Sequence, residues 1–156
     1  MAFKSVPTQE EKVTIRQARV TDYDKVKSLL VDAGLTTDEF FTRVRFIRTL
    51  HDFGKYNLVA KKEGKLVGYI SGFDDSGKSG EPKFYGYLGR WVVDPSYRHK
   101  GIGKELLERS IEEFRRSGYA VIFAGVKRDN LASKTALEKV GFGDDGYLLL
   151  IRDQET

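Results

Sequence analysis

The feature that most constrains this chain is a short basic run with two glycines, Arg98-His99-Lys100-Gly101-Ile102-Gly103-Lys104. It follows the apolar residues 91–93 and opens an amphipathic stretch that extends to Gly118. Glycines carry no Cβ, so the backbone can come close to a ligand. The free N–H groups at a helix N-terminus and the helix dipole both favour an anion there. The sequence therefore predicts a turn between a strand and a helix that binds a phosphate group.

Two common phosphate-binding loops do not fit this run. A Walker-type loop has Gly where this chain has Arg98 and Ser or Thr where it has Glu105. A dinucleotide fingerprint has a third glycine where this chain has Leu106. The alternative without a ligand is a turn that simply ends at Gly101, with the neighbouring lysines in solvent.

Composition bounds the class of protein. The chain has 156 residues, of which 40% are hydrophobic and 32% charged, and this balance predicts one globular domain over 1–156, with 1–12 as a loose lead-in. No apolar run reaches the ~20 residues that span a membrane, and no signal peptide is apparent, which favours a cytoplasmic protein without membrane contact. With no cysteine and two histidines, no metal site is expected. The net charge of +4 is small and dispersed, so no nucleic-acid partner is expected.

Hydrophobic periodicity predicts the element order β-α-α-β-β-β-α-β-α-β. Strands are expected over residues 13–18, 57–62, 65–73, 84–93, 119–126 and 147–152. Helices are expected from Thr21-Asp22 to Gly34, from Thr37-Asp38 to Leu50, from Gly101 to Ser117 and from Asn130 to Val140. This pattern indicates the α/β class, of the α+β type.

A second motif lies downstream of the basic run. Arg98 to Gly103 fits the pattern Arg/Gln-x-x-Gly-x-Gly/Ala, and Asn130 is followed by Lys139-Val140-Gly141-Phe142. Together these motifs resemble those of the GNAT superfamily of N-acetyltransferases, and the resemblance covers Leu88 to Phe142. It implies a single-domain GNAT fold with a mixed, mostly antiparallel sheet of about seven strands flanked by four helices.

The resemblance implies acetyl-coenzyme A as the cofactor. The backbone of the basic run would hold its pyrophosphate, the strand before it would pair with the pantetheine arm, and the Val93 N–H would donate to the thioester oxygen. Asn130 would hydrogen-bond the cofactor, although it also suits a helix N-cap. The implied cofactor-binding residues are Trp91, Val92, Val93, Arg98, His99, Lys100, Gly101, Ile102, Gly103, Lys104 and Asn130.

The proton-transfer positions depart from the family. Leu137 is at the position where many members have a Tyr that protonates the departing thiolate. Tyr87 and Gly125 are at two positions where members commonly have a carboxylate base. Tyr87, Tyr147 and Tyr119 are candidate substitutes, each of which also suits an aromatic in the core or at its rim. At neutral pH about a tenth of an α-amine is neutral but only about one part in 10³ of a lysine amine, so a missing base costs an α-amine less. We therefore expect either an acceptor amine of low pKa or a proton relayed by water.

The segment between the first two strands would shape the acceptor site. Its aromatic and basic residues form either a lip for a carboxylate-bearing acceptor or core aromatics beside a solvated face. They are Phe40, Phe41, Arg43, Arg45 and Arg48.

The implied reaction is acetyl transfer to a primary amine by direct attack in a ternary complex, since without cysteine no acetyl-cysteine can form. The acceptor is expected to be a small-molecule amine or a protein or peptide N-terminal α-amine, and a homodimer stays open. The alternatives are a non-catalytic acyl-coenzyme A sensor on the same fold and, less favoured, a nucleic-acid module.

Overall fold

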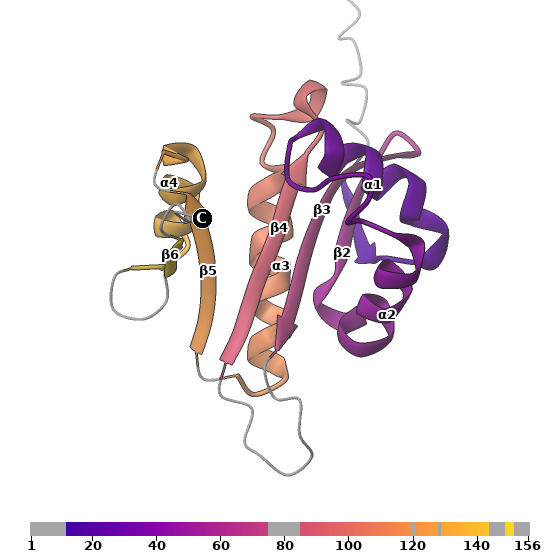
Figure 1. Cartoon of the computed structure of the whole chain (residues 1–156). Coiled ribbons are helices and arrows are strands. Elements are labelled where there is room, and N and C mark those ends of the chain that lie inside the picture. The colour runs from indigo at the N-terminus through magenta and orange to yellow at the C-terminus, as the bar shows by residue number, and fades with distance from the viewer. Residues whose placement is uncertain (1–11, 75–84, 120, 128, 144–148, 152–156) are drawn as a thin grey trace, which may run out of the picture.

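The computed structural model describes residues 12–74, 85–119, 121–127, 129–143 and 149–151 (Figure 1). Its strands are β1 (Thr14–Gln17), β2 (Leu58–Lys62), β3 (Lys65–Asp74), β4 (Tyr85–Val93), β5 (Val121–Lys127) and β6 (Leu149–Ile151). Its α-helices are α1 (Tyr23–Asp32), α2 (Arg43–Phe53), α3 (Ile102–Arg116) and α4 (Leu131–Lys139). The predicted class and element order are confirmed, and the described residues form six strands rather than about seven.

The start of α2 differs from the prediction. Thr37 does not begin a helix but forms a turn, because its hydroxyl and carbonyl accept hydrogen bonds from Phe40 N (3.2 Å) and Phe41 N (3.0 Å). Thr42 caps α2 instead, since its hydroxyl accepts from Arg45 N at 3.3 Å. Residues 37–41 are therefore a loop beside the sheet.

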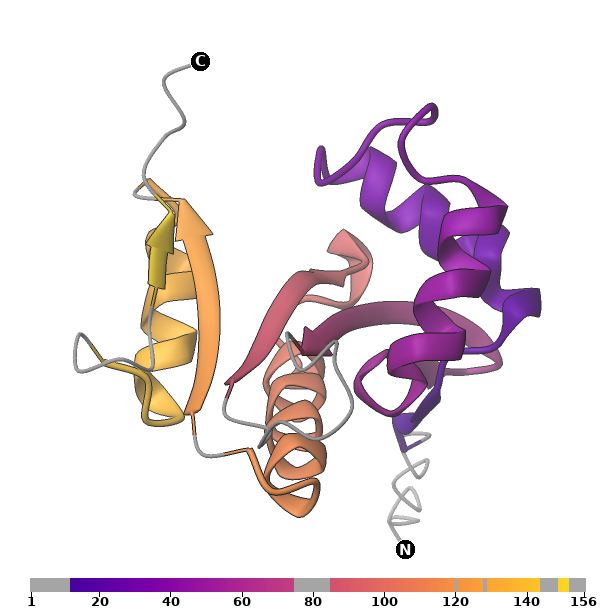
Figure 2. The same cartoon turned by 60° about the horizontal axis from the view of Figure 1, so that its bottom comes forward.

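The strands follow chain order across one mixed sheet, β1-β2-β3-β4-β5-β6. The pairs from β1 to β4 are antiparallel, whereas β4–β5 and β5–β6 are parallel and are joined by the crossover helices α3 and α4. Helices α1 and α2 lie on one face of the sheet and α3 on the other (Figure 2). Six consecutive residues of β3, 67–72, are therefore buried, whichever face of the sheet they point to.

Each face of the sheet carries its own apolar cluster. The α3 cluster contains Leu106, Phe114 and Leu137, and the α1–α2 cluster contains Val26 and Phe46. Within the α3 cluster two glycines of the sheet make room for the ring of Phe114. A Cβ added at Gly72 or Gly86 would lie 2.9 or 2.5 Å from that ring.

A β-bulge in β4 determines where β5 leaves the sheet. Ile70 is opposite Trp91 and Gly72 is opposite Leu88, so two steps along β3 face three steps along β4. The parallel pairing of β4 with β5 ends at Leu88↔Ala124, where the bulge begins. Bulges bend a strand and increase its twist. Beyond this point β4 and β5 separate (Figure 2).

Candidate functional site

The backbone of β4 beyond the bulge has an edge that β5 does not pair. Asp94 N donates to Val67 O at 2.7 Å, so this N–H points toward β3. Successive N–H groups of a strand point in opposite directions, which turns the Val93 N–H away from β3, toward the side where β5 no longer pairs with β4. This donor was predicted from sequence to face the thioester oxygen.

The basic run forms a tight turn into α3. The turn uses two left-handed residues, His99 (φ 63°) and Gly101 (φ 80°), and Gly101 is the N-cap of the helix. Glu105 N donates to Gly101 O at 3.0 Å, so the N–H groups of residues 102–104 precede the first helical hydrogen bond. Trp91 Nε1 donates to Gly103 O at 3.0 Å and fixes the turn against β4. The helix N-terminus thus presents backbone donors without a capping side chain.

The cationic side chains of the run are exposed, and each has a contact nearby. Arg98 Nε donates to Val93 O at 3.4 Å, and Lys100 Nζ lies 5.6 Å from the centre of the Tyr97 ring. Lys104 Nζ lies 3.7 Å from a carboxylate oxygen of Glu108 on the next turn of α3. The positive charge therefore surrounds the turn and remains open to solvent.

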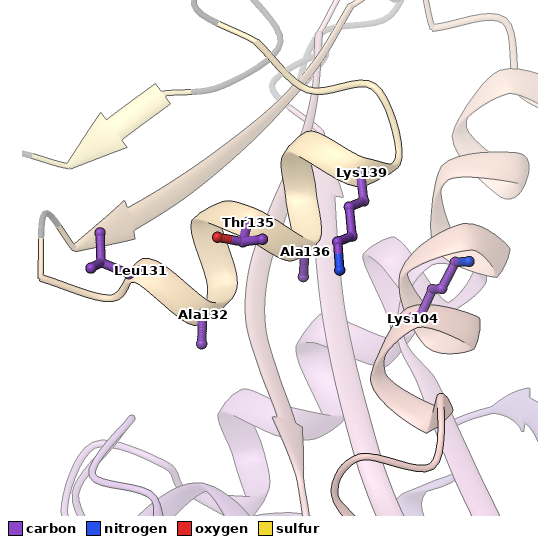
Figure 3. Close-up of a pocket in the computed structure, with 6 residues that line it drawn as sticks. All are labelled: Lys104, Leu131, Ala132, Thr135, Ala136 and Lys139. Atoms are coloured by element: carbon purple, nitrogen blue, oxygen red, sulfur yellow. The ribbon is translucent and has the colours of Figure 1, made fainter.

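A pocket of about 430 Å³ lies between α3 and α4 (Figure 3). Its lining residues are Lys104, Leu131, Ala132, Thr135, Ala136 and Lys139. Asn130 precedes α4 as its N-cap, and its Oδ1 accepts from Ser133 N at 3.2 Å. The sequence reasoning did not assign Lys139 to the site, although the motif that contains it marks the end of α4. The pocket places this second lysine across from Lys104.

The residues at the usual proton-transfer positions differ in their surroundings. Leu137 is buried in the α3 cluster, and Gly125 pairs with Leu149 of β6. The half-buried ring of Tyr87 stacks on Phe73 and Phe123 with centroid separations of 5.1 and 5.6 Å. These positions hold apolar contacts or backbone pairing.

The other candidate tyrosines differ in placement. The Tyr119 side chain is buried and its hydroxyl donates to the Asp74 carboxylate. Tyr147 lies outside the described residues. Burial raises the pKa of Tyr69, whose hydroxyl donates to Asn57 Oδ1 at 2.6 Å. Tyr69 is therefore a core residue with a buried hydrogen bond.

The expected acceptor segment divides between the two interpretations. Phe41 is buried in the α1–α2 cluster, whereas Phe40 is 54% exposed. Arg43 pairs with Asp24 (3.5 Å), and Arg45 lies over the Phe40 ring. Arg48 is exposed on α2. One aromatic is thus core, and the other stands in solvent with an arginine on it.

The described residues contain no group of three or more His, Asp or Glu side chains placed to hold a metal ion. Within the same residues no helix combines the length and apolar character needed to cross a bilayer.

Sequence comparisons identify relatives among acetyltransferases. An L-methionine sulfoximine/L-methionine sulfone acetyltransferase of Salmonella typhimurium is 34% identical over 90 residues, which cover 54% of this chain and 48% of that protein. N-alpha-acetyltransferase RimI of Mycobacterium tuberculosis is 33% identical over 67% of this chain and 63% of that protein. The matched region is thus less than two thirds of either relative.

Solved structures extend the similarity to the fold. The Salmonella typhimurium acetyltransferase yncA, solved with its cofactor acetyl-CoA, has a TM-score of 0.70 and 28% identity over 84% of this chain and 79% of that one. A ribosomal-protein-alanine N-acetyltransferase of Brucella melitensis has a TM-score of 0.70 and 29% identity over 83% of this chain and 84% of that one. The model of the acetyltransferase (GNAT) family matches residues 23–142, a span that holds the bulged strand, the basic turn and α4. The chain therefore belongs to the GNAT family of acetyltransferases.

Proposed function

We propose that the protein transfers an acetyl group from acetyl-coenzyme A to a primary amine by direct attack in a ternary complex. The observation that carries this proposal is the Val93 N–H, which points away from β3 on the side where β5 no longer pairs with β4. A backbone donor fixed in a sheet can stabilise the charge that develops on a carbonyl oxygen without moving. The cofactor supplies the acetyl thioester when it is bound.

The basic turn fits the pyrophosphate of this cofactor. The N–H groups of residues 102–104 precede the first helical hydrogen bond, and a Cβ added at Gly101 would meet no heavy atom of the described residues within 4 Å beyond its immediate neighbours. Charged acceptors at a helix N-terminus gain both from these donors and from the helix dipole. The Asn130 amide nitrogen can donate while its Oδ1 caps α4. The edge of residues 91–93 that β5 does not pair would accept the pantetheine arm as an added strand.

The acceptor is proposed to be an α-amine, of a small molecule or of a peptide N-terminus. In the residues that the structure describes, the three usual proton-transfer positions hold Leu137, Gly125 and Tyr87, which supply neither a carboxylate nor the usual Tyr of α4. General acid–base catalysis raises a reaction rate by about 10²–10⁴-fold. An α-amine near pKa 8 depends on it least, because a larger fraction of the amine is already neutral at pH 7. Two relatives support this class by name, an L-amino acid N-acyltransferase and an N-alpha-acetyltransferase.

The test measures thiol release from acetyl-coenzyme A with pools of α-amines and of ε-amines. We expect release with α-amines and a clear preference for them at neutral pH. Preference for ε-amines would contradict the low-pKa acceptor. The packed Leu137 also favours a second function, a non-catalytic acyl-coenzyme A sensor. Tight calorimetric binding of coenzyme A without thiol release above background would favour the sensor over the enzyme.

A further inference from the structure

Residues of β4 beyond the bulge point to two different faces of the sheet. Trp91 and Val93 pack with the α3 cluster, and Val92 packs with the α1–α2 cluster. The guanidinium carbon of Arg90 lies 5.9 Å from the ring centre of Phe41, which belongs to the α1–α2 cluster. The Arg90 side chain is therefore on the face opposite α3. If the cofactor occupies the α3 and α4 side, the acceptor approaches from the side of Arg90.

Two arginines and one exposed ring form a group on this face, which we name the guanidinium cluster: Arg45, Arg90 and Phe40. The guanidinium carbons of Arg45 and Arg90 lie 4.4 and 5.6 Å from the Phe40 ring centre. Backbone carbonyls hold both side chains, since Arg45 Nη1 donates to Phe40 O (3.0 Å) and Arg90 Nε donates to Leu35 O (3.4 Å). The two cations are thus oriented by a loop and an aromatic ring.

The charge of this cluster is not neutralised within the described residues. The neighbouring Arg43 has a carboxylate partner, because its Nη2 lies 3.5 Å from Asp24 Oδ1. In the part of the chain that the structure describes, no ion pair joins Arg45 or Arg90 to a carboxylate. Each guanidinium has five N–H donors in a planar fork that suits a carboxylate, and the bonds given above use one of them. The cluster therefore has both the charge and the free donors for an oxyanion.

We infer that Arg45 and Arg90 bind a carboxylate of the acceptor, beside Phe40. This inference rests on the proposed function, because it assigns the acceptor class of that reaction. Arg90 precedes Val93 by three residues, which is about 10 Å along a strand. An arginine side chain can bridge much of that distance. The carboxylate belongs either to a free amino acid or to an acidic residue near a peptide N-terminus.

The experiment compares acceptors that differ only in the carboxylate. One pair is L-phenylalanine and L-phenylalaninamide, and the other is two short peptides with Glu or Gln as their second residue. Charge-assisted hydrogen bonds are about twice as strong as neutral ones, so we expect KM for the carboxylate member of at least one pair to be lower by about tenfold or more. The pair that shows this preference identifies the source of the carboxylate. An adjacent carboxylate keeps an ammonium protonated, so proton availability alone would favour phenylalaninamide.

Variants separate the cluster from general charge. Arg45→Ala and Arg90→Gln should each remove most of the carboxylate preference and leave calorimetric binding of coenzyme A unchanged. Arg109→Ala removes the same charge from the outer side of α3 and should leave the preference intact. Binding of the preferred acceptor to the protein saturated with coenzyme A gives a readout that needs no turnover. Transfer to amines without a carboxylate preference, or equal effects of all three variants, would overturn the inference alone. Failure of every amine would overturn the proposed function and this inference with it.

Discussion

Replacing Gly101 by Ala directly tests whether the basic turn of residues 98–104 binds the pyrophosphate of coenzyme A. Gly101 is left-handed, with φ +80°, and a Cβ there would meet no heavy atom of the described residues within 4 Å beyond its immediate neighbours. The substitution therefore introduces backbone strain without a clash. For an L residue this conformation costs about 1–2 kcal/mol, and 1 kcal/mol lowers the Tm of a chain of this size by about 2–4 °C. We expect Gly101→Ala to melt about 2–8 °C lower than the parent.

The chain provides a matched control at the other end of α3. Gly118 has φ +88° and equally open surroundings, so Gly118→Ala should lose the same stability. Only Gly101 faces the N–H groups proposed to hold the pyrophosphate. Loss of one hydrogen bond to a charged group costs about 1.5–3 kcal/mol, so Gly101→Ala should weaken coenzyme A binding by about tenfold or more.

Differential scanning calorimetry and isothermal titration of coenzyme A measure the two quantities independently. Equal affinities of Gly101→Ala and Gly118→Ala for coenzyme A would refute pyrophosphate binding by the basic turn. An unchanged Tm in Gly101→Ala would refute the strain argument, whatever the affinity.

Three further substitutions address packing, charge and capping. Gly86→Ala should destabilise the fold by about 1–3 kcal/mol in chemical denaturation, because its Cβ would overlap the Phe114 ring. Asp22→Asn should cost about 1–3 kcal/mol at pH 7, because Asp22 accepts two bonds from Arg16 at 2.7 and 2.9 Å, and the loss should shrink below about pH 4. Asn130→Asp should keep the Tm, because Asp caps helices as well as Asn, but should weaken coenzyme A binding through loss of the amide donor.

The sign of the pH effect follows from the environment of Asp22. Burial alone would raise the pKa of its carboxyl, but hydrogen bonds from Arg16 and the Arg19 N–H, with the charges of Arg16 and Lys61, lower it below its usual value. A group whose folded pKa is depressed adds stability above its unfolded pKa and loses it as the pH falls through the folded pKa. A difference between parent and Asp22→Asn that stays constant from pH 7 to pH 3 would contradict this account.

The sequence predicted those elements whose structure is determined by neighbouring residues. The turn from Arg98 to Lys104 has its left-handed glycine and helix start where the residue types require them. The predicted start of α2 at Thr37 was wrong because Thr37 and Thr42 are both suitable N-caps. Packing of Phe41 in the core selects Thr42. Periodicity alone could not resolve this choice.

Features that depend on distant segments could not be predicted from the sequence. The bulge of β4 appears only in its register with β3, and it changes the face to which Arg90 points. Arg90 meets the Leu35 carbonyl across 55 positions of sequence, so the guanidinium cluster exists only in the folded chain. The sequence showed the arginines of the acceptor segment but could not show that one of them shares an aromatic ring with a residue of the sheet.

The acceptor carboxylate and the missing base are connected through the pKa of the acceptor amine. A carboxylate raises the pKa of its own ammonium, whereas arginines that neutralise the carboxylate cancel this effect and favour the neutral amine. One unit charge at about 8 Å in water is worth about 0.5 kcal/mol, or a few tenths of a pKa unit. For a carboxylate-bearing acceptor, kcat rises with pH as the bound amine loses its proton. The pH at the midpoint of this rise should therefore be higher by about that amount in Arg45→Ala and in Arg90→Gln. The amide acceptor has no carboxylate for the arginines to neutralise, so its pH dependence of kcat is the reference. A pH profile that does not move while KM rises would show that the two arginines bind the acceptor without aiding its deprotonation.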